Sequence, residues 1–362
     1  MTRTNLFFCG STLVFAGLAC NLGQSSQTPT VAPAQITQPP TSTPLPPTPP
    51  PTATTAPESP PATATLAATE PVACTAGNKG ESPLYSHMVM RTTSADGIIF
   101  DPAAELVLEH ASVPDGVIGP DGAQWVYFVN GEPGQHGPFA AREASPGVWE
   151  VIDCVKLDGE FVGDAVDPDI VRLSDGRFRL FYFLGHFVSP PPPGAMLHPM
   201  YSAISDDGIN FTVEQIVLEV EQATDPTAVE LPDGSWLLAV AQAQDGRTLL
   251  AASDDGYNFE LTGDVFEGGG IPELGLLADG RVVLYTSGVF VSADGGATWD
   301  QVPGARVPGN GADPSIVALA DGTYMFYFKT FEGGQPGPQP VGTPVRQPGQ
   351  PLLPPLTPTV DG

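Results

Sequence analysis

Six carboxyl groups flank a proline that recurs five times along the sequence. The position before the proline holds Val113, Asp167, Asp225, Ile271 and Asp313. The position after it holds Asp115, Asp169, Thr227, Glu273 and Ser315. Carboxyl groups that lie close together raise one another's pKa values, so that one carries a proton while its neighbour is ionised. If the five prolines surround one site, the sequence predicts general acid–base chemistry there.

The proline belongs to a repeat with fixed internal spacing. Asp-Gly follows seven and eight residues after the proline, and a run of aromatic and branched residues comes next. The five copies are Pro114…Asp121-Gly122, Pro168…Asp175-Gly176, Pro226…Asp233-Gly234, Pro272…Asp279-Gly280 and Pro314…Asp321-Gly322. Asp-Gly between two such runs predicts a β-hairpin in which both turn residues take positive φ. We therefore expect five inner hairpins whose first strands begin at the prolines.

A second pattern interleaves with the first. It combines Ser, Asp-Gly and an aromatic residue, and it occurs at residues 94–100, 205–211, 253–259 and, one residue longer, 292–299, with a degenerate copy at 145–149. The pattern resembles the Asp-box of sialidase-like propellers, a tight turn whose Ser and Asp side chains bond the local backbone. We assign these boxes a structural role and no chemistry.

One inner and one outer hairpin make four strands, and units of roughly 40–55 residues are typical of a β-propeller blade. The first box precedes the first inner hairpin, and no box follows the last one. The sequence therefore predicts an all-β fold, a five-bladed β-propeller with a mixed closing blade. Residues 86–101 would supply the outer strands of that blade, so that no sheet edge is left free.

The ends of the chain differ from its middle in composition. Residues 1–20 resemble an export signal, with Arg3 followed by an apolar run too short to span a membrane. Gly17-Leu18-Ala19-Cys20 resembles a bacterial lipobox, which implies a lipid on Cys20; the alternative is an ordinary cleaved signal with a chance cysteine. Residues 21–73 are predicted to be a disordered Thr/Pro-rich linker and 332–362 a disordered Pro-rich tail. The predicted domain is 74–331, exported and either anchored at the cell surface or extracellular.

Cysteines and charge limit the partners. Cys74 and Cys154 remain as an even pair in an oxidising compartment and are predicted to form a disulfide, two buried thiols being the alternative. A net charge of −28 with 13 basic residues excludes nucleic acid and anionic lipid as partners. We expect a monomer that meets the membrane only through its lipid. The five histidines show no metal-ligand spacing, so neither metal nor cofactor is predicted.

The segments Asp167-Pro168-Asp169, Asp225-Pro226-Thr227 and Asp313-Pro314-Ser315, each followed by an Asp-Gly hairpin, resemble the five-bladed propeller glycosidases. This superfamily includes arabinanases, β-xylosidases and invertases. The resemblance implies hydrolysis of a neutral or furanosidic glycan by a pair of carboxyl groups. By position, it assigns the base to Asp115, the orienting acid to Asp225 and the proton donor to Glu273. The family's base usually precedes the proline, where this chain has Val113.

The remaining polar residues near the prolines are expected to bind substrate: Asp167, Asp169, Asp313 and His136. A structural alternative is that aspartates before proline bond backbone amides at the strand start. The chain would then be a non-catalytic propeller that binds a glycan or a protein, and whether it is an enzyme stays open. No arginine stands at a strand start, which argues against the carboxylate-binding cluster of a sialidase.

Overall fold

The computed structural model of the chain describes residues 74–75, 83–185, 197–242, 245–308 and 312–331. The predicted signal, linker and tail (1–20, 21–73 and 332–362) lie outside these ranges. Strands dominate the described residues, with one short 3₁₀ helix, η1 (Pro83–Ser86). Within those ranges, no helix has the length and apolar character needed to cross a membrane.

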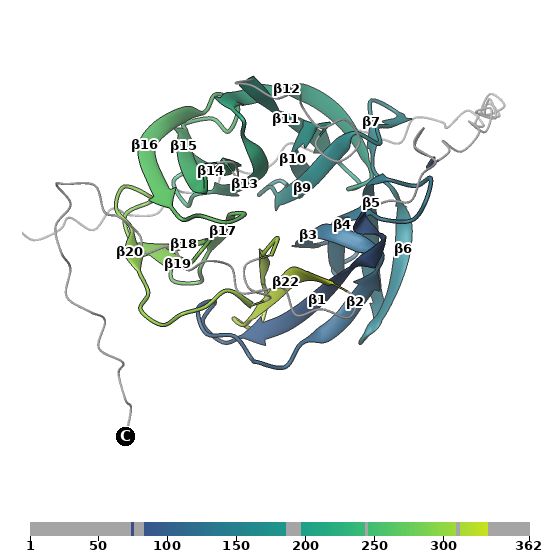
Figure 1. Ribbon diagram of the computed structural model, residues 1–362, viewed down its shortest axis with the longest axis horizontal. Coiled ribbons are helices and arrows are strands. Elements are labelled where there is room, and N and C mark those ends of the chain that lie inside the picture. Colours follow the sequence, from purple (N-terminus) through teal and green to yellow (C-terminus); the bar gives the residue numbers. More distant parts are fainter. Residues whose placement is uncertain (1–73, 76–82, 186–196, 243–244, 309–311, 332–362) are drawn as a thin grey trace, which may run out of the picture. The chain divides into compact units, whose positions relative to one another are not determined.

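Five sheets surround a central axis as the blades of a propeller, each with its first strand innermost (Figure 1). Blade 1 contains β3 (Ala111–Ile118), β4 (Gln124–Asn130), β5 (Gly137–Ser145) and β6 (Val148–Cys154). Blade 2 contains β9 (Ala165–Arg172), β10 (Phe178–Leu184), β11 (Leu197–Ser205) and β12 (Asn210–Glu221), extended by β7 (Lys156–Leu157) and β8 (Glu160–Phe161). Blade 3 contains β13 (Thr224–Glu230), β14 (Trp236–Gln242), β15 (Arg247–Ser253) and β16 (Glu260–Glu267). Blade 4 contains β17 (Glu273–Leu276), β18 (Val282–Tyr285), β19 (Val289–Ser292) and β20 (Asp300–Gln301).

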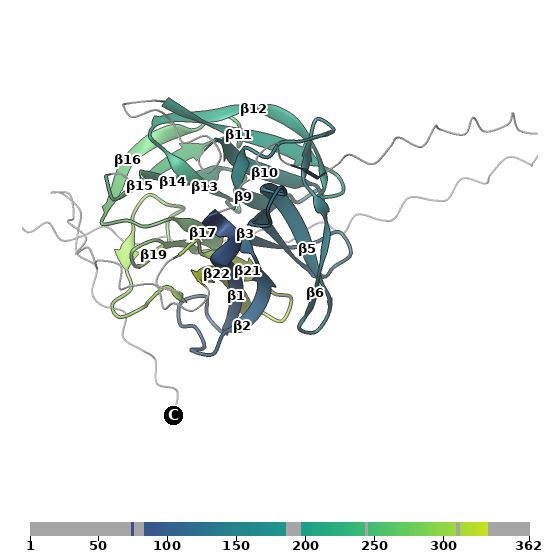
Figure 2. The same cartoon turned by 45° about the vertical axis from the view of Figure 1, so that its right-hand side comes forward.

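The fifth blade closes the ring with strands from both ends of the described chain. Its inner strands are β21 (Ser315–Ala318) and β22 (Tyr324–Phe331), and its outer strands are β1 (His87–Ser94) and β2 (Glu105–Glu109). β1 and β22 pair antiparallel, from His87 opposite Phe331 to Ser94 opposite Tyr324. Figure 2 shows β3, β9, β13, β17 and β21 around the axis and β2, β6, β12 and β16 at the periphery. The prediction of a five-bladed propeller with a mixed closing blade is confirmed.

The inner hairpin turns differ from the predicted type. In blade 2, the Gly176 N–H donates to the Leu173 carbonyl at 2.9 Å, and the Leu173 N–H donates to the Arg177 carbonyl at 2.8 Å. The glycine of each Asp-Gly pair has a φ of 81–92°, whereas the preceding aspartate does not take positive φ. These are type I turns that end in a left-handed glycine. The expectation that both turn residues take positive φ is wrong.

The repeat prolines also differ from expectation, since they do not all begin strands. Pro114, Pro168 and Pro226 lie inside β3, β9 and β13. The register of the inner hairpin shifts at each of them, as between Ser112 and Asp115 in blade 1. A bulge removes the proline nitrogen from the hydrogen-bond ladder, so an inner strand tolerates it.

The boxes form the predicted local bonds. The Ser94 hydroxyl accepts the Gly97 N–H at 2.9 Å, and one Asp96 oxygen accepts the N–H groups of Ile98 and Ile99, each at 2.8 Å. The boxes at 205, 253 and 292 repeat this arrangement. Their glycines also permit contacts between blades. A Cβ on Gly208 would lie 2.7 Å from the Tyr127 hydroxyl of blade 1, which donates to the Gly208 carbonyl at 2.6 Å.

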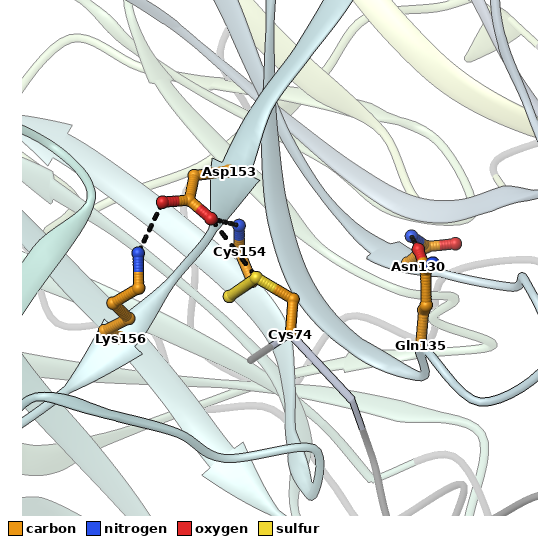
Figure 3. The surroundings of a disulfide bond; sticks show 6 residues. All are labelled: Cys74, Asn130, Gln135, Asp153, Cys154 and Lys156. Atoms are coloured by element: carbon orange, nitrogen blue, oxygen red, sulfur yellow. Dashed lines mark hydrogen bonds and ion pairs between the residues drawn. A yellow bond between two sulfur atoms is a disulfide. The ribbon is translucent and has the colours of Figure 1, made fainter. Parts of the chain in front are cut away.

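A disulfide ties the chain before η1 to the outer strand of blade 1. Cys74 and Cys154 are bonded across a sequence separation of 80 residues. Figure 3 shows Asp153 beside the sulfurs, where its carboxylate accepts the Cys154 N–H at 2.8 Å and contacts the Lys156 ammonium. The two cysteines thus lie together as the sequence predicts.

Candidate functional site

The starts of the five inner strands surround a cavity of about 20 Å³ at the axis of the propeller. Its lining is the set of residues that flank the repeat prolines, with the prolines themselves: Val113, Pro114, Asp115, Asp167, Pro168, Asp169, Asp225, Pro226, Thr227, Ile271, Pro272, Glu273, Asp313 and Pro314. A cavity needs roughly 10–15 Å³ to hold one water molecule. The space therefore fits a water or a single ion, and a sugar ring does not enter it.

The backbone divides the six acids into two sets. Val113, Asp167, Asp225 and Asp313 have φ values of 50°, 50°, 50° and 44°, in the left-handed region. In a regular strand, the residues before and after each proline would lie on the same side. The left-handed conformation interrupts this alternation. The electrostatic contacts follow the division: Asp115 raises the pKa values of Asp169 and Glu273, whereas the pKa values of Asp167 and Asp225 respond to Asp313 and Lys329. Two sets replace the single ring that the sequence predicts.

We call the five residues after the prolines the axial ring: Asp115, Asp169, Thr227, Glu273 and Ser315. Each of these side chains accepts a hydrogen bond from a backbone N–H in the next blade. The donors are Ile170, Ala228, Leu274, Ile316 and Gly116, at 2.5, 3.0, 3.1, 3.0 and 2.9 Å respectively. Every donor stands two residues after its own repeat proline. The bonds join blade 1 to 2, 2 to 3, 3 to 4, 4 to 5 and 5 to 1, so the axial ring holds the propeller closed.

The acids of the axial ring are buried and close together. One oxygen from each of Asp115, Asp169 and Glu273 lies within 4.8 Å of the other two. Burial raises the pKa of Asp115 to about 7, and it raises the pKa values of Asp169 and Glu273 well above their usual range, with the neighbouring carboxylates adding to the effect. These three are the residues in the described part of the chain that could hold a cation at the axis, because hard cations prefer oxygen ligands.

Hydroxyl groups occupy the remaining oxygens of two ring acids. Ser315 donates to Asp115 at 2.7 Å, and Thr227 donates to Glu273 at 3.0 Å. Both carboxyl oxygens of Asp115 and both of Glu273 therefore accept bonds from within the protein. This arrangement favours a structural role for the two residues that the family resemblance makes base and acid.

The acids before the prolines form the second set, with a lysine from the closing blade. We call Asp167, Asp225, Asp313 and Lys329 the mouth cluster. The Lys329 ammonium contacts Asp313, and the Asp167 and Asp225 carboxyl groups lie close enough for each to shift the pKa of the other. Asp167 and Asp313 are buried, whereas Asp225 is partly exposed. The cluster thus opens to solvent at Asp225.

Burial and neighbouring charges raise the pKa values of Asp167 and Asp225 in the mouth cluster. Burial, followed by the charges of Asp225 and Asp313, raises the pKa of Asp167 well above its usual range. Burial and the Asp313 charge raise the pKa of Asp225 to about 6. Burial lowers the pKa of Lys329, but its pairing with Asp313 outweighs this and the pKa is raised. Asp167 and Asp225 thus both hold their protons to a higher pH than an exposed aspartate does, next to the Lys329 ammonium.

Lys329 and His87 belong to the site but do not appear among the residues predicted for it. The Lys329 N–H donates to the Ala312 carbonyl at 2.9 Å, which places its side chain beside Asp313. His87 bonds the Ser112 hydroxyl at 2.8 Å, and burial together with Lys329 lowers its pKa to about 4. A signal for Lys329 exists in the sequence, since it ends the aromatic run that pairs with the last inner strand.

The rest of the mouth is apolar. Val113 and Ile271 take the positions that hold aspartate in the other three blades. Val113 is buried in one cluster with Leu84 of η1 and Val166 of blade 2. η1 approaches blade 1 so closely that a Cβ on Gly131 would lie 2.5 Å from the Leu84 carbonyl oxygen. No carboxylate of the described chain stands where the family's base would be.

His136 does not join the other predicted site residues. It is buried, and its Nδ1 lies 3.2 Å from the Gly163 carbonyl oxygen. Burial lowers its pKa, so the ring is neutral at physiological pH. It is not among the residues that line the axial cavity. These contacts are between blades 1 and 2, and they favour a packing role.

The sequence matches no protein-family model and no curated protein. The structure is similar to solved propellers at low identity. A protein of unknown function from Dyadobacter fermentans is 17% identical, with 59% of this chain and 73% of that chain covered and a TM-score of 0.43. A family 117 glycoside hydrolase from Zobellia galactanivorans is 12% identical, with 61% and 84% covered and a TM-score of 0.44. An endo-arabinase from Bacteroides thetaiotaomicron is 14% identical, with 60% and 88% covered and a TM-score of 0.43.

At this identity and TM-score, the likenesses assign no activity to the chain. The five-bladed propeller itself follows from the strand order of the five sheets. A fold of this kind hosts many activities, so the function has to be argued from the residues of the site.

Proposed function

We propose that this chain is an exported propeller that binds a glycan at its axial mouth without cleaving it. The observation that carries the proposal is the bonding of Asp115 and Glu273, whose carboxyl oxygens all accept bonds that hold the blades together. The mouth cluster is the set of charged groups at the axis that remains available, with Asp225 toward solvent.

The chemistry of the mouth cluster suits a polyhydroxylated ligand. A sugar hydroxyl both donates and accepts hydrogen bonds. Asp225 and Asp313 offer acceptors, whereas Lys329 and the protonated Asp167 offer donors. The small cavity beneath the cluster admits no ring, so the ligand would lie across the mouth and place single hydroxyl groups toward the axis.

Binding of the full chain to a glycan array, followed by calorimetry with the best ligand, tests this proposal. Asp225→Asn should weaken binding about tenfold or more, because it removes the one partly exposed carboxylate of the cluster. Asp175→Asn is the matched control, since Asp175 lies in a hairpin turn at the opposite end of blade 2. Binding without any released product supports the proposal, and the absence of binding to every glycan would overturn it.

Hydrolysis is the second candidate, and the Asp167–Asp225 pair favours it. A protonated and an ionised carboxyl group side by side are the requirement for acid–base catalysis. The family assignment adds Asp115 as base and Glu273 as acid, with Asp169 and Asp313 as substrate contacts. Turnover of arabinose-, xylose- or fructose-containing glycans that is lost in both Asp225→Asn and Glu273→Gln would support hydrolysis. A wild-type chain inert on this panel would exclude it for these substrates.

The predicted location of the chain is part of the same proposal. Processing at Cys20 with lipid attachment would fix the propeller to a membrane surface through residues 21–73. The support is the lipobox-like Gly17-Leu18-Ala19-Cys20. Mass spectrometry of the mature N-terminus tests this directly. A lipidated Cys20, and release of the Cys20→Ser variant into the medium, are the expected results.

A further inference from the structure

A recess lies away from the mouth, between blade 4 and the closing blade. It has a volume of about 550 Å³. Three segments form its walls: the box turn of the closing blade, the stretch that follows β20, and the end of β22. We call it the blade 4–5 groove. Its apolar walls include Ile98, Ile99, Phe100, Val302, Val307 and Phe328, together with Pro102, Pro303 and Pro308.

The groove exists because the outer strand of blade 4 is unusually short. β20 has two residues, whereas the outer strands of the other blades have five (β2), seven (β6), twelve (β12) and eight (β16). The next residues pack toward Phe100 and Phe328 without forming a strand. Ile99 at the rim is 72% exposed. Ile98, Phe100, Val302 and Val307 are half-buried, so the recess keeps apolar side chains in partial contact with solvent. Apolar surface left in contact with solvent within a recess is where a ligand can bind.

The lining indicates which ligand would fit. Prolines and aromatic rings line grooves that bind proline-rich segments in the extended polyproline conformation, which loses little entropy on binding. This chain contains such a segment at residues 351–356, Pro-Leu-Leu-Pro-Pro-Leu. It is uncharged and carries three leucines for apolar pockets. Residues 39–52 are as rich in proline but have a single leucine, Leu45.

The segment is also connected at the right place. The described chain ends at Phe331, three residues after the groove residue Phe328. The nineteen residues between Phe331 and the segment span at most about 70 Å when extended, which is ample for this distance. A covalent connection of this length gives an effective concentration in the millimolar range, so even a weak site is occupied. We propose that residues 351–356 bind in the blade 4–5 groove of their own chain.

Hydrogen exchange of the full chain tests the proposal. A triple variant changes Leu352, Leu353 and Leu356 to Asp. Amide exchange is then followed at residues 98–104 and 302–308. The expected result is exchange at least tenfold faster in both segments, with blades 1–3 unchanged. Leu45→Asp in the other proline-rich segment is the control and should change nothing. Equal exchange in the triple variant and the wild type would overturn the proposal.

A second variant tests the groove without touching the tail. Ile99→Asp replaces a side chain that is already mostly exposed, so the fold tolerates it, and it should give the same faster exchange. A peptide of residues 347–358, added to the triple Leu variant, should restore slow exchange, and it should fail to do so when Ile99→Asp is also present. Protection that rises with protein concentration would assign the groove to the tail of a second copy and overturn binding within one chain.

Discussion

The two ends of the propeller use acidic side chains in opposite ways. At the end that carries the hairpin turns, exposed aspartates accept amide bonds from their own turns, and their pKa values are lowered: Asp96, Asp121, Asp175, Asp207, Asp233, Asp255, Asp279, Asp294 and Asp321. At the axial end the acids are mostly buried, and their pKa values are raised: Asp115, Asp167, Asp169, Asp225 and Glu273.

A matched pair shows what makes the difference. Asp175 accepts the Arg177 N–H at 3.0 Å, and Asp169 accepts the Ala228 N–H at 3.0 Å. The bonds are equal in length, yet the pKa of Asp175 is lowered and that of Asp169 is raised. Asp175 is exposed and also pairs with Arg177, whereas Asp169 is buried near Asp115. Desolvation and like charge outweigh the amide bond at the axis.

Removal of Lys329 should have the largest effect on the axial end. Lys329→Met leaves Asp313 buried without its partner, beside Asp167 and Asp225. We expect a loss of about 3–5 kcal/mol in the free energy of unfolding at pH 7.5. The control is Lys156→Met, whose partner Asp153 has a half-exposed side chain, with an expected loss below about 1 kcal/mol. Denaturant titration measures both, and equal losses would contradict a buried pair.

Asp115→Ala should come next in size, because it breaks the axial ring. The Ile170 amide and the Ser315 hydroxyl would both lose their acceptor. Each unsatisfied buried group costs about 1–3 kcal/mol, so we expect a total loss of about 2–4 kcal/mol. The measurement is made at pH 6, where Asp115 is mostly protonated and little charge repulsion is relieved. Asp175→Ala on the opposite end should cost much less than Asp115→Ala, because Asp175 is exposed. A loss as large there would remove the contrast between the two ends.

The sequence predicts the architecture well because the repeat contains its own turn chemistry. Each Asp-Gly turn and each box is a local structure, decided by residues within five positions of one another. The order of boxes and hairpins then implies the mixed closing blade. The turn type differs from the prediction for a local reason. A type I turn followed by one left-handed glycine closes the hairpin, so the aspartate before the glycine need not take positive φ.

The site was harder to predict because it depends on a backbone detail and on distant contacts. The left-handed φ of Asp167, Asp225 and Asp313 separates residues that strand alternation would group. The partners of the ring acids come from the neighbouring blade, as in the bond from Ile170 to Asp115, 55 residues apart. Lys329 enters the site through the closing blade itself, where its N–H donates to the Ala312 carbonyl beside Asp313. Residue type and spacing contain neither the left-handed φ values nor the partners of the ring acids.

The two ends should respond oppositely to pH. The axial carboxyl groups have folded pKa values above their unfolded values, so the folded state binds extra protons. Stability therefore falls as pH rises from about 4, the unfolded value, to about 6 for Asp225 and about 7 for Asp115, where the loss is complete. The turn aspartates have lowered folded values, so their contribution is present above about pH 4 and is lost as pH falls further. We expect the Tm to be highest near pH 4 and lower by about 5 °C or more at pH 8.5.

Two variants test which carboxyl groups cause the fall in Tm on each side of its maximum. Asp225→Asn removes one titrating group from the mouth and should flatten the decline between about pH 4 and 6. Asp233→Asn removes one turn carboxylate and should flatten the decline below pH 4, because Asp233 bonds the Ser235 amide. A Tm that rises steadily from pH 5 to 8.5 would mean that the axial acids are not desolvated in the folded chain.

The smallest effect is expected at Val113, which marks the boundary between the acidic and the apolar part of the mouth. Val113 has a φ of 50°, an unfavourable conformation for a β-branched residue and an easier one for Asp or Asn. Val113→Asn and Val113→Asp relieve this strain equally and differ only in charge. Since Val113 lines the same cavity as Asp167 and Asp225, the Asp variant should match the Asn variant at pH 4.5 and be less stable by about 1 kcal/mol at pH 8. Thermal unfolding at the two pH values measures this difference. Equal stability of the two variants at both pH values would show that a charge at position 113 is not repelled by the mouth carboxylates. The presence of Val113 in place of an acid would then not reduce repulsion in the mouth.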